Sequence, residues 1–348
     1  LALAAAIPVL PGAMADGVDY LVDFQWNMAM RQDAVVTFIE PGGGEALLSL
    51  SRFPGVLYAE PFRAVPVRLF NGHRERTAAI TGMPAAPRLN RLLDSQERVV
   101  PVPGSGLLLS EKLAEVLDLS PGDEIRMEVR EGRRPVLATF LSGTITDFTG
   151  VGAYMEIEGL RRLLGEGTTA SGAYLQVDSL YWDEFWRRVK ETPRIGSVTT
   201  TAGARESFSK TTEEMMGVSQ MLYLVFSLIV SFGVIYNGAR IALSERSRSL
   251  ATLRVLGFTR REVTTILLSE LGLLTLLSIG PGLLLGTWMA KSILESVDTE
   301  TMRFPLILGA RTYVVAVLTV FVSTVFSFVV VGRRIAGLDL LAVLKSAE

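Results

Sequence analysis

The sequence has no cysteine and a single histidine, His73, among its 348 residues. The lack of cysteine excludes disulfides, thiolate metal sites and cysteine nucleophiles, and one histidine without cysteine cannot form a usual zinc site. The pattern G-x-x-x-x-G-K-[ST] is also absent, so the chain does not itself cradle ATP in a P-loop. No arrangement of nucleophile and base stands out. We therefore predict no enzyme activity and no bound cofactor.

Charged residues make up 20% of the chain, whereas hydrophobic residues make up 49%, and the mean hydropathy is +0.36. Such a composition indicates a membrane part joined to a sizeable soluble part. The net charge of −2 gives no reason to expect a nucleic-acid partner. Residues 218–348 have 12 Lys and Arg against 8 Asp and Glu, while residues 1–217 have 22 against 28. This division predicts an acidic outer domain and basic inner loops.

Three long segments lack charge altogether, which is what a bilayer-spanning helix of about 20 apolar residues requires. They are Met215–Ala239, Leu271–Ala290 and Thr312–Gly332. We predict transmembrane helices over 215–239, 263–290 and 312–332. The shorter apolar run at the start, LALAAAIPVLPGAMA, is interpreted as the end of a first transmembrane helix over 1–16. A secretory signal h-region is the alternative. Because the chain begins at Leu1, we expect a piece of a longer protein.

Short loops rich in Lys and Arg stay in the cytoplasm. The loop between the second and third helices and the tail 333–348 are therefore predicted to be cytoplasmic, and residues 20–214 to lie outside. Glu270 falls inside the third helix. A carboxylate within the membrane either pairs with a neighbouring helix or takes part in transport.

The outer region is predicted to be an α+β domain built from two β-α-β units, a split sandwich. The expected strands are Ala34–Ile39, Gly55–Glu60, Val65–Phe70, Arg76–Thr81, Tyr174–Val177 and Ile195–Thr200, and the expected helices are Glu45–Arg52 and Tyr181–Glu191. A β-rich insert is expected over 82–170, with a helix at Leu108–Leu119 and paired strands at Glu124–Arg130 and Pro135–Ser142. Ala204–Met216 is predicted to be helical and to run straight into the second transmembrane helix.

The segment from Ser244 to Glu262, SERSRSLATLRVLGFTRRE, holds five arginines and no lysine between two apolar runs. It predicts a short amphipathic helix over 244–256, a left-handed stop at Gly257 and a capping box, Thr259 to Glu262, that opens the next helix. Two interpretations remain open at this point. The helix rests on anionic lipid, or it presents its leucines to the groove of a cytoplasmic partner.

Three stretches resemble the FtsX-like permeases of ABC transporters, of the MacB and LolC type. They are YNGARIALSERSRSLATLRVLGFTRREV (Tyr236–Val263), ILLSELGLL around Glu270, and RRIAGLDLLAVLK (Arg333–Lys345). The expected topology, one helix, a large outer domain and three more helices, is also similar to that family. The resemblance covers nearly the whole chain and is sharpest in these stretches.

The resemblance implies that the helix at 244–256 is a coupling helix, which docks on a separate cytoplasmic ABC ATPase that binds the ATP. The residues implied in coupling are Glu245, Arg246, Arg248, Leu250, Leu253, Arg254, Leu256 and Gly257. It further implies a multi-pass protein of the bacterial inner membrane with a periplasmic core domain, which exports or extracts a lipoprotein, lipid, peptide or drug, or activates a partner without transport. A second permease module should face this one, either in the same chain, of which this is then the C-terminal half, or through homodimerisation.

Two other classes compete with this interpretation. The first is a membrane sensor with an outer ligand domain and no transport. A sensor normally carries a cytoplasmic signalling domain, and the short segment after Gly332 argues against this class. The second is a secondary transporter that uses Glu270, although three or four helices are few and no inverted repeat is visible.

Overall fold

The computed structural model describes residues 2–147, 151–245, 249, 252–253, 256–296 and 306–337. The chain divides into two compact units. The helical unit comprises the described residues of Leu1–Asp19, Thr212–Val297 and Leu306–Glu348, and the α+β unit comprises those of Tyr20–Thr211. Each unit is described by itself.

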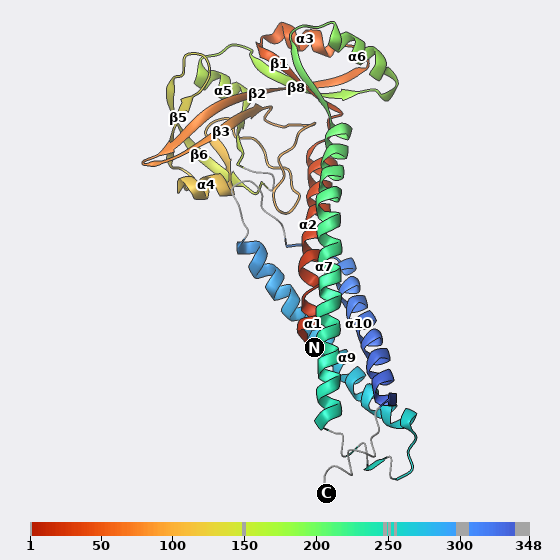
Figure 1. Ribbon diagram of the computed structural model, residues 1–348. Helices are drawn as coiled ribbons and strands as arrows, with labels where there is room; N and C mark the ends of the chain where they lie inside the picture. The colour runs from red at the N-terminus through yellow and green to blue at the C-terminus, as the bar shows by residue number, and fades with distance from the viewer. Residues whose placement is uncertain are drawn as a thin grey trace. The chain divides into compact units, whose positions relative to one another are not determined.

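The first layer of the α+β unit is an antiparallel sheet with the strand order β2-β8-β1-β9. Its strands are β1 (Ala34–Gly42), β2 (Val56–Asn71), β8 (Ala170–Val177) and β9 (Ile195–Thr200). The helices α3 (Gly44–Ser51) and α6 (Trp182–Lys190), the latter preceded by the short η2 (Ser179–Tyr181), lie on one face of this sheet (Figure 1). Phe185 of α6 is fully buried between them, and its ring contacts Phe53 and Trp182. The predicted split β-α-β sandwich is therefore confirmed.

The second part of the α+β unit is a closed barrel. Its strands follow the order β3-β7-β4-β6-β5-β2, and the pairing of β2 with β3 closes the ring. The new strands are β3 (Arg74–Met83), β4 (Leu107–Ser110), β5 (Glu124–Val129), β6 (Val136–Ile145) and β7 (Ala153–Glu156). The helices α4 (Glu111–Leu117) and α5 (Ile157–Leu164) pack against the barrel and contribute leucines to its core. Alternate inward residues such as Val65, Val67 and Leu69 fill the interior, so the predicted β-rich insert is a barrel with its own core.

The two strands predicted at Gly55–Glu60 and Val65–Phe70 are one strand, β2, and their separation was wrong. Pro61 and Pro66 suggest a break because proline cannot donate to a ladder. In the structure both prolines lie within the pairing, opposite Ala173 and Ala79. β2 is long because its first half pairs with β8 of the sandwich and its second half pairs with β3 and β5 of the barrel.

The helix predicted at Leu108–Leu119 is also partly wrong. Leu107–Ser110 form β4, whose four side chains are all buried, and only Glu111–Leu117 are helical. A run of leucines fits a buried strand as well as a helix. Ser110 marks the change, because its Oγ accepts a hydrogen bond from the Leu113 N–H at the start of α4.

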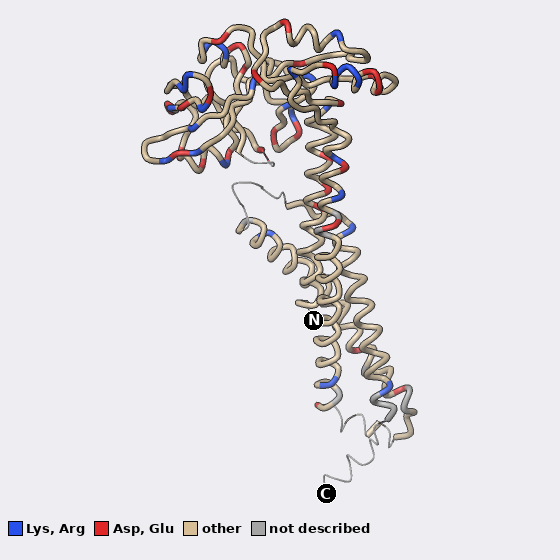
Figure 2. Tube along the Cα trace, turned by 45° about the horizontal axis from the view of Figure 1, so that its top comes forward, with Lys and Arg blue, Asp and Glu red and all other residues tan. Residues whose placement is uncertain are grey.

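The helical unit contains the parts of the chain that suit a bilayer. Its helices are α1 (Ala2–Ala6), most of α2 (Val9–Asp23) and of α7 (Thr201–Glu245), α9 (Arg260–Ser296) and α10 (Ala310–Gly337). The π-helix η1 (Phe24–Ala29) continues α2 and belongs to the α+β unit. Within the described residues four helices are long and apolar enough to cross a membrane: Ala2–Ala29, Thr201–Ala242, Glu262–Leu294 and Ala310–Arg333. Lys, Arg, Asp and Glu are few along the greater part of these helices (Figure 2). The predicted fold class, membrane helices with an α+β domain, is confirmed.

The first transmembrane helix was predicted to end near residue 16, and this boundary was wrong. It continues past Asp16, Asp19 and Asp23. α7 likewise begins at Thr201 and runs without interruption to Glu245, so the expected helix at 204–216 and the second transmembrane helix are one element.

Small residues let the helices approach closely. A Cβ atom placed on Gly282 of α9 would lie 2.5 Å from the Ala2 carbonyl oxygen, and one on Gly286 would lie 2.8 Å from that of Ala6. This is the small-xxx-small spacing that brings transmembrane helices together. Buried serines add to the packing, since Ser231 Oγ donates to the Ala4 carbonyl at 3.1 Å.

Candidate functional site

The arginine-rich segment begins where α7 ends. Ser244 and Glu245 are the last residues of α7 and not the start of a separate helix, so the predicted boundary at 244 was wrong. Ser249, Thr252 and Leu253 are helical. Four of the predicted coupling residues, Arg246, Arg248, Leu250 and Arg254, lie outside the described residues. Glu245, Leu253, Leu256 and Gly257 are described.

Gly257 stops the helical segment, as predicted. Its φ of +100° is a conformation that L side chains rarely adopt. The Phe258 N–H bonds to the Leu253 carbonyl at 3.1 Å, the 6→1 bond of a Schellman stop. The turn therefore fixes how the chain leaves this segment and enters α9.

The predicted capping box is present at the start of α9. The Thr259 N–H donates to Glu262 Oε2 at 2.7 Å, and the Glu262 N–H donates back to Thr259 Oγ1 at 3.3 Å. Each side chain thus satisfies a backbone group that the first turn of a helix leaves without a partner. A cap of this kind is worth about 1 kcal/mol.

Leu253 faces inward. It packs against a cluster of apolar residues at which α7, α9 and α10 meet, formed by Ala239, Val263, Leu271 and Val331. Leu256 and Phe258 do the opposite, since 71% and 40% of their surfaces are exposed. Of the two described leucines predicted to face a partner, only Leu256 offers an open apolar surface, while Leu253 holds the segment to the helices.

Glu270 and Glu245 occupy different positions in the helical unit. Glu270 is half-buried in α9, next to Leu271 of the cluster just described. Glu245 is exposed at the end of α7.

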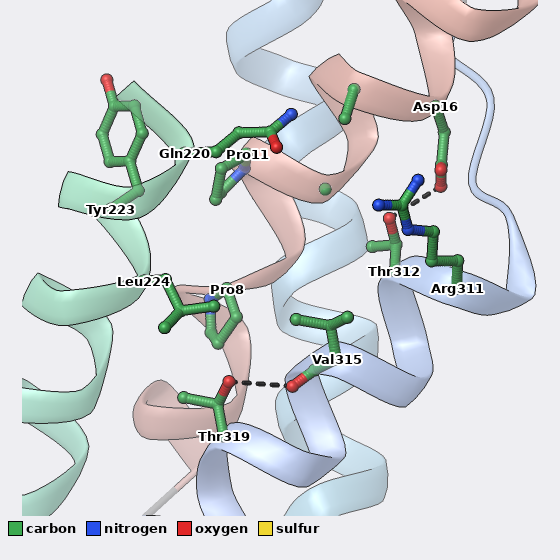
Figure 3. Close-up of a pocket in the computed structure, with 12 residues that line it drawn as sticks. Pro8, Pro11, Asp16, Gln220, Tyr223, Leu224, Arg311, Thr312, Val315 and Thr319 are labelled. Atoms are coloured by element: carbon green, nitrogen blue, oxygen red, sulfur yellow. Dashed lines mark hydrogen bonds between the residues drawn. The ribbon is translucent and has the colours of Figure 1, made fainter. Parts of the chain in front are cut away.

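A second feature was missed from the sequence: Asp16 of α2 caps α10. Its Oδ2 accepts hydrogen bonds from the Gly309 N–H and from Thr312 Oγ1, each at 2.7 Å. Figure 3 shows the bond between Asp16 and Thr312. A carboxylate is well placed at a helix N-terminus, where N–H groups lack partners and the helix dipole is positive. The signal was the aspartate itself, since a carboxylate within an apolar run calls for a named partner.

A cavity of about 180 Å³ lies beside this cap, between α2, α7 and α10. Gln220 and Tyr223 reach it from α7, and Val315 and Thr319 line it from α10 (Figure 3). Most of its surface is apolar. The Arg311 guanidinium at its edge is 4.0 Å from the Asp19 carboxylate, and both side chains are largely exposed. Among the described residues no group of three or more His, Asp or Glu side chains could hold a metal ion.

Part of the helical unit matches a known protein family. Residues 221–340 match the family described as FtsX-like permease C-terminal. These residues form an FtsX-like permease domain. The domain comprises most of α7, the arginine-rich segment with its Gly257 stop, the capping box, α9 and α10.

A relative with a similar sequence is also a permease protein. An uncharacterized ABC transporter permease protein, Rv0987 of Mycobacterium tuberculosis, is 24% identical over 214 residues, which are 60% of this chain and 24% of that protein. The chain thus spans about a quarter of this relative's length. The family match is therefore stated for residues 221–340, and the four helices long and apolar enough to cross a membrane indicate a multi-pass membrane protein. Permeases of this type are not themselves enzymes.

Two solved domains are also similar to the chain. The extracellular domain of the ABC-type transporter YknZ from Gram-positive bacteria has 15% identity and a TM-score of 0.32, covering 44% of this chain and 87% of that one. The periplasmic region of MacB from Actinobacillus actinomycetemcomitans has 11% identity and a TM-score of 0.34, covering 52% and 94%.

Proposed function

We propose that this permease couples ATP hydrolysis by a separate cytoplasmic ATPase to movement of its α+β unit, which lies on the outer side of the membrane. The observation that carries the proposal is the family match over residues 221–340, because permeases of ABC transporters work with an ATP-binding partner. The chain has no P-loop of its own. The arginine-rich segment is the part that docks, with its arginines keeping it on the cytoplasmic side.

Leu256 and Phe258 are the described apolar contacts that we assign to the partner, because both are exposed beside the Gly257 stop. Leu253 transmits force by its packing on the cluster of α7, α9 and α10. The Gly257 stop and the capping box make the connection to α9 rigid. A push on the segment therefore reaches α9 without being absorbed in the turn.

The work done outside is the export or extraction of a lipoprotein, lipid, peptide or drug. A second permease module, from the same protein or from a second copy, faces this one and shields part of the apolar surface that α7 exposes, which includes Met221, Leu222 and Phe226. Membrane lipid covers the remainder.

Co-purification from the native host tests this function. We expect a P-loop ATPase to accompany the full-length protein in a mild detergent, in a fixed ratio measured by mass spectrometry. Leu256→Asp should reduce the recovered ATPase by about tenfold or more, since a charge replaces an apolar contact in a groove. Leu180→Asp is the matched control, because Leu180 is 84% exposed in the α+β unit.

Recovery of the ATPase with Leu256→Asp at the level of the control would place the docking surface elsewhere. No ATPase in any of several detergents would refute the proposal and favour a membrane sensor, with the arginine-rich segment resting on lipid.

A further inference from the structure

A polar cavity of about 210 Å³ lies inside the α+β unit, at the point where η1 meets the loop 88–93. Its lining includes Gln25, Asn90, Arg91, Asp147, Tyr154 and Tyr174. η1 is a π-helix, a rare form that occurs frequently at functional sites. η1 follows α2 directly in the chain.

Backbone and side-chain bonds hold the walls of the cavity in place. The Arg31 N–H donates to the Leu89 carbonyl at 2.7 Å, and the Arg91 N–H donates to the Ala29 carbonyl at 3.0 Å. Glu60 Oε2 accepts from the backbone of Arg88 at 2.7 Å. The loop and η1 are thus fixed against each other, so the cavity is not a chance gap between mobile parts.

Arg91 lacks the partners that a guanidinium in this setting needs. Its Nη2 donates to the Met28 carbonyl at 2.7 Å, but its Nε is buried without a hydrogen bond. Within the described part of the chain no carboxylate forms an ion pair with Arg91, and the nearby positive charge is Arg31. Burial first and Arg31 second lower the pKa of Arg91. The Arg91 side chain is half-buried, but a buried N–H donor without an acceptor costs free energy. An anionic group that enters the cavity would supply the acceptor that Nε lacks.

Buried polar atoms without a partner are few among the described residues. Seven buried side-chain nitrogen or oxygen atoms of the described residues lack a hydrogen bond. Five of these atoms belong to Trp26, Gln32, Glu60 and Arg91, and the other two belong to serines of the helical unit. Native proteins keep few such atoms, and each needs a reason. Of these four residues, Arg91 is the one that lines the cavity, so a ligand there would give its Nε an acceptor.

The opposite wall carries the opposite charge. Asp147 Oδ2 accepts a hydrogen bond from the buried Tyr154 hydroxyl at 2.7 Å. Burial first, and then Asp147, raise the pKa of Tyr154 well above its ordinary value, so the hydroxyl keeps its proton and orients the carboxylate. Burial likewise raises the pKa of Tyr174 to about 12, and Asn90 hydrogen-bonds its side chain. The cavity therefore offers one fixed cation, one fixed carboxylate and neutral hydrogen-bonding groups.

We propose that this cavity binds a small zwitterion, whose acidic group is held by Arg91 and whose ammonium group faces Asp147. The acidic group is a carboxylate or a phosphate, since the guanidinium fork suits both. Such a zwitterion comes either from a free amino acid or from the phosphoethanolamine head group of a lipid. This inference does not depend on the ATPase partner.

Isothermal titration calorimetry on the purified full-length protein in detergent tests the proposal. The probes are L-serine, O-phosphoethanolamine, inorganic phosphate and ethanolamine. We expect one of the two zwitterions to bind with one site per chain. The dissociation constants of phosphate and of ethanolamine should each be about tenfold higher than that of this zwitterion, or higher still. Stronger binding of serine indicates a free amino acid as the ligand, and stronger binding of phosphoethanolamine indicates a lipid head group.

Variants connect the binding to the two charges. Arg91→Gln and Asp147→Asn should each weaken binding of the zwitterion by about tenfold or more. Asp147→Asn should leave binding of inorganic phosphate unchanged or stronger, a result that general unfolding cannot produce. Arg126→Gln, an exposed arginine of the barrel, is the matched control and should bind like the native protein.

Three results would overturn the proposal. The first is that neither zwitterion binds up to millimolar concentration, and the second is that inorganic phosphate binds as tightly as the better zwitterion. The third is that Arg91→Gln binds the zwitterion as tightly as the control variant does. Arg91→Lys decides the case in which Arg91→Gln fails to fold. It keeps the charge without the fork, so it should bind the zwitterion more weakly than the native protein and more tightly than any variant without the charge. Native-like affinity of Arg91→Lys would exclude the assigned role of the guanidinium.

Discussion

Arg63 shows how a single side chain joins two parts of the α+β unit. It lies in β2, where this strand passes from the sandwich to the barrel, and only 2% of it is exposed. Its Nε and Nη2 bond to the two oxygens of Glu166 at 3.0 and 2.7 Å, and Nη2 also pairs with Glu131. Nη1 donates to the Ser171 hydroxyl at 3.1 Å. Glu131 belongs to the barrel and Ser171 to the sandwich strand β8, so the guanidinium ties both to one point.

Replacing Arg63 with glutamine should destabilise the α+β unit strongly, because two carboxylates then lose their buried partner. Breaking a buried pair in this way costs about 3 kcal/mol or more, which for a unit of this size lowers the melting temperature by about 6–12 °C. Thermal unfolding followed by tryptophan fluorescence measures the change. Arg126→Gln, whose partner Glu124 is 3.9 Å away on the surface, should change stability by less than about 0.5 kcal/mol. Equal losses in both variants would contradict the role given to Arg63.

Glu166 predicts a pH dependence of the same unit. The hydrogen bond from Arg63, followed by that from Thr169, lowers the pKa of Glu166 below its ordinary value. A carboxyl group with a lowered pKa in the folded state stabilises the fold above the unfolded pKa of about 4.3 and loses that contribution as pH falls through the folded pKa. We expect the melting temperature of the native protein to fall more steeply between about pH 5 and pH 3 than that of Glu166→Gln. Other carboxyl groups act equally in both proteins, so parallel curves would show that Glu166 contributes nothing to acid sensitivity.

Among the elements, α9 has two neighbouring glycines with different surroundings, Gly280 and Gly282. Substituting each of them allows a controlled comparison. A Cβ atom on Gly282 would meet the Ala2 carbonyl and the Ala5 methyl group of α1, whereas a Cβ atom on Gly280 would meet nothing within 4 Å. Both positions lie in the same helix and gain the same helix propensity from alanine, about 1 kcal/mol. The difference between the two substitutions therefore isolates the contact between α1 and α9.

We expect Gly280→Ala to leave the helical unit as stable as before or slightly more stable, and Gly282→Ala to destabilise it by about 1–3 kcal/mol through overpacking. Hydrogen–deuterium exchange of the α1 amides in detergent measures the effect locally, with faster exchange expected only for Gly282→Ala. If α1 exchanged equally in both variants, the close approach of α1 to Gly282 would not exist in solution.

Elements defined by local chemistry could be predicted from the sequence, and those defined by distant partners could not. Gly257 and the box of Thr259 and Glu262 follow from backbone rules that operate within a few residues. The direction of Leu253 depends on residues of three helices far apart in the chain. The continuity of β2 likewise depends on pairing with β8, more than 100 residues later. Arg63 and Asp16 were missed for the same reason, because their partners lie far along the chain.

At the scale of the whole molecule, the chain connects its two units through α7. This helix starts in the α+β unit at Thr201, crosses into the helical unit at Thr212 and ends at Glu245. An unbroken α-helix resists bending, because each turn is held by hydrogen bonds from one residue to the fourth before it. Under the proposed function we expect α7 to carry a movement of the helices in the membrane to the α+β unit.

Lys210→Pro tests this connection, since proline removes one of those bonds and clashes with the preceding turn at a local cost of about 3 kcal/mol. Lys210 is exposed, so both units should keep their own melting temperatures, and Lys210→Ala is the matched control. In a complex reconstituted with its ATPase, we expect Lys210→Pro to retain the bound ATPase but to lose most of the ATP-driven movement of the α+β unit. That movement is read as the change in fluorescence of a probe placed at exposed Leu180 on addition of ATP. A response equal to that of Lys210→Ala would show that α7 does not transmit the movement, while loss of the ATPase itself would place the fault in docking and not in transmission.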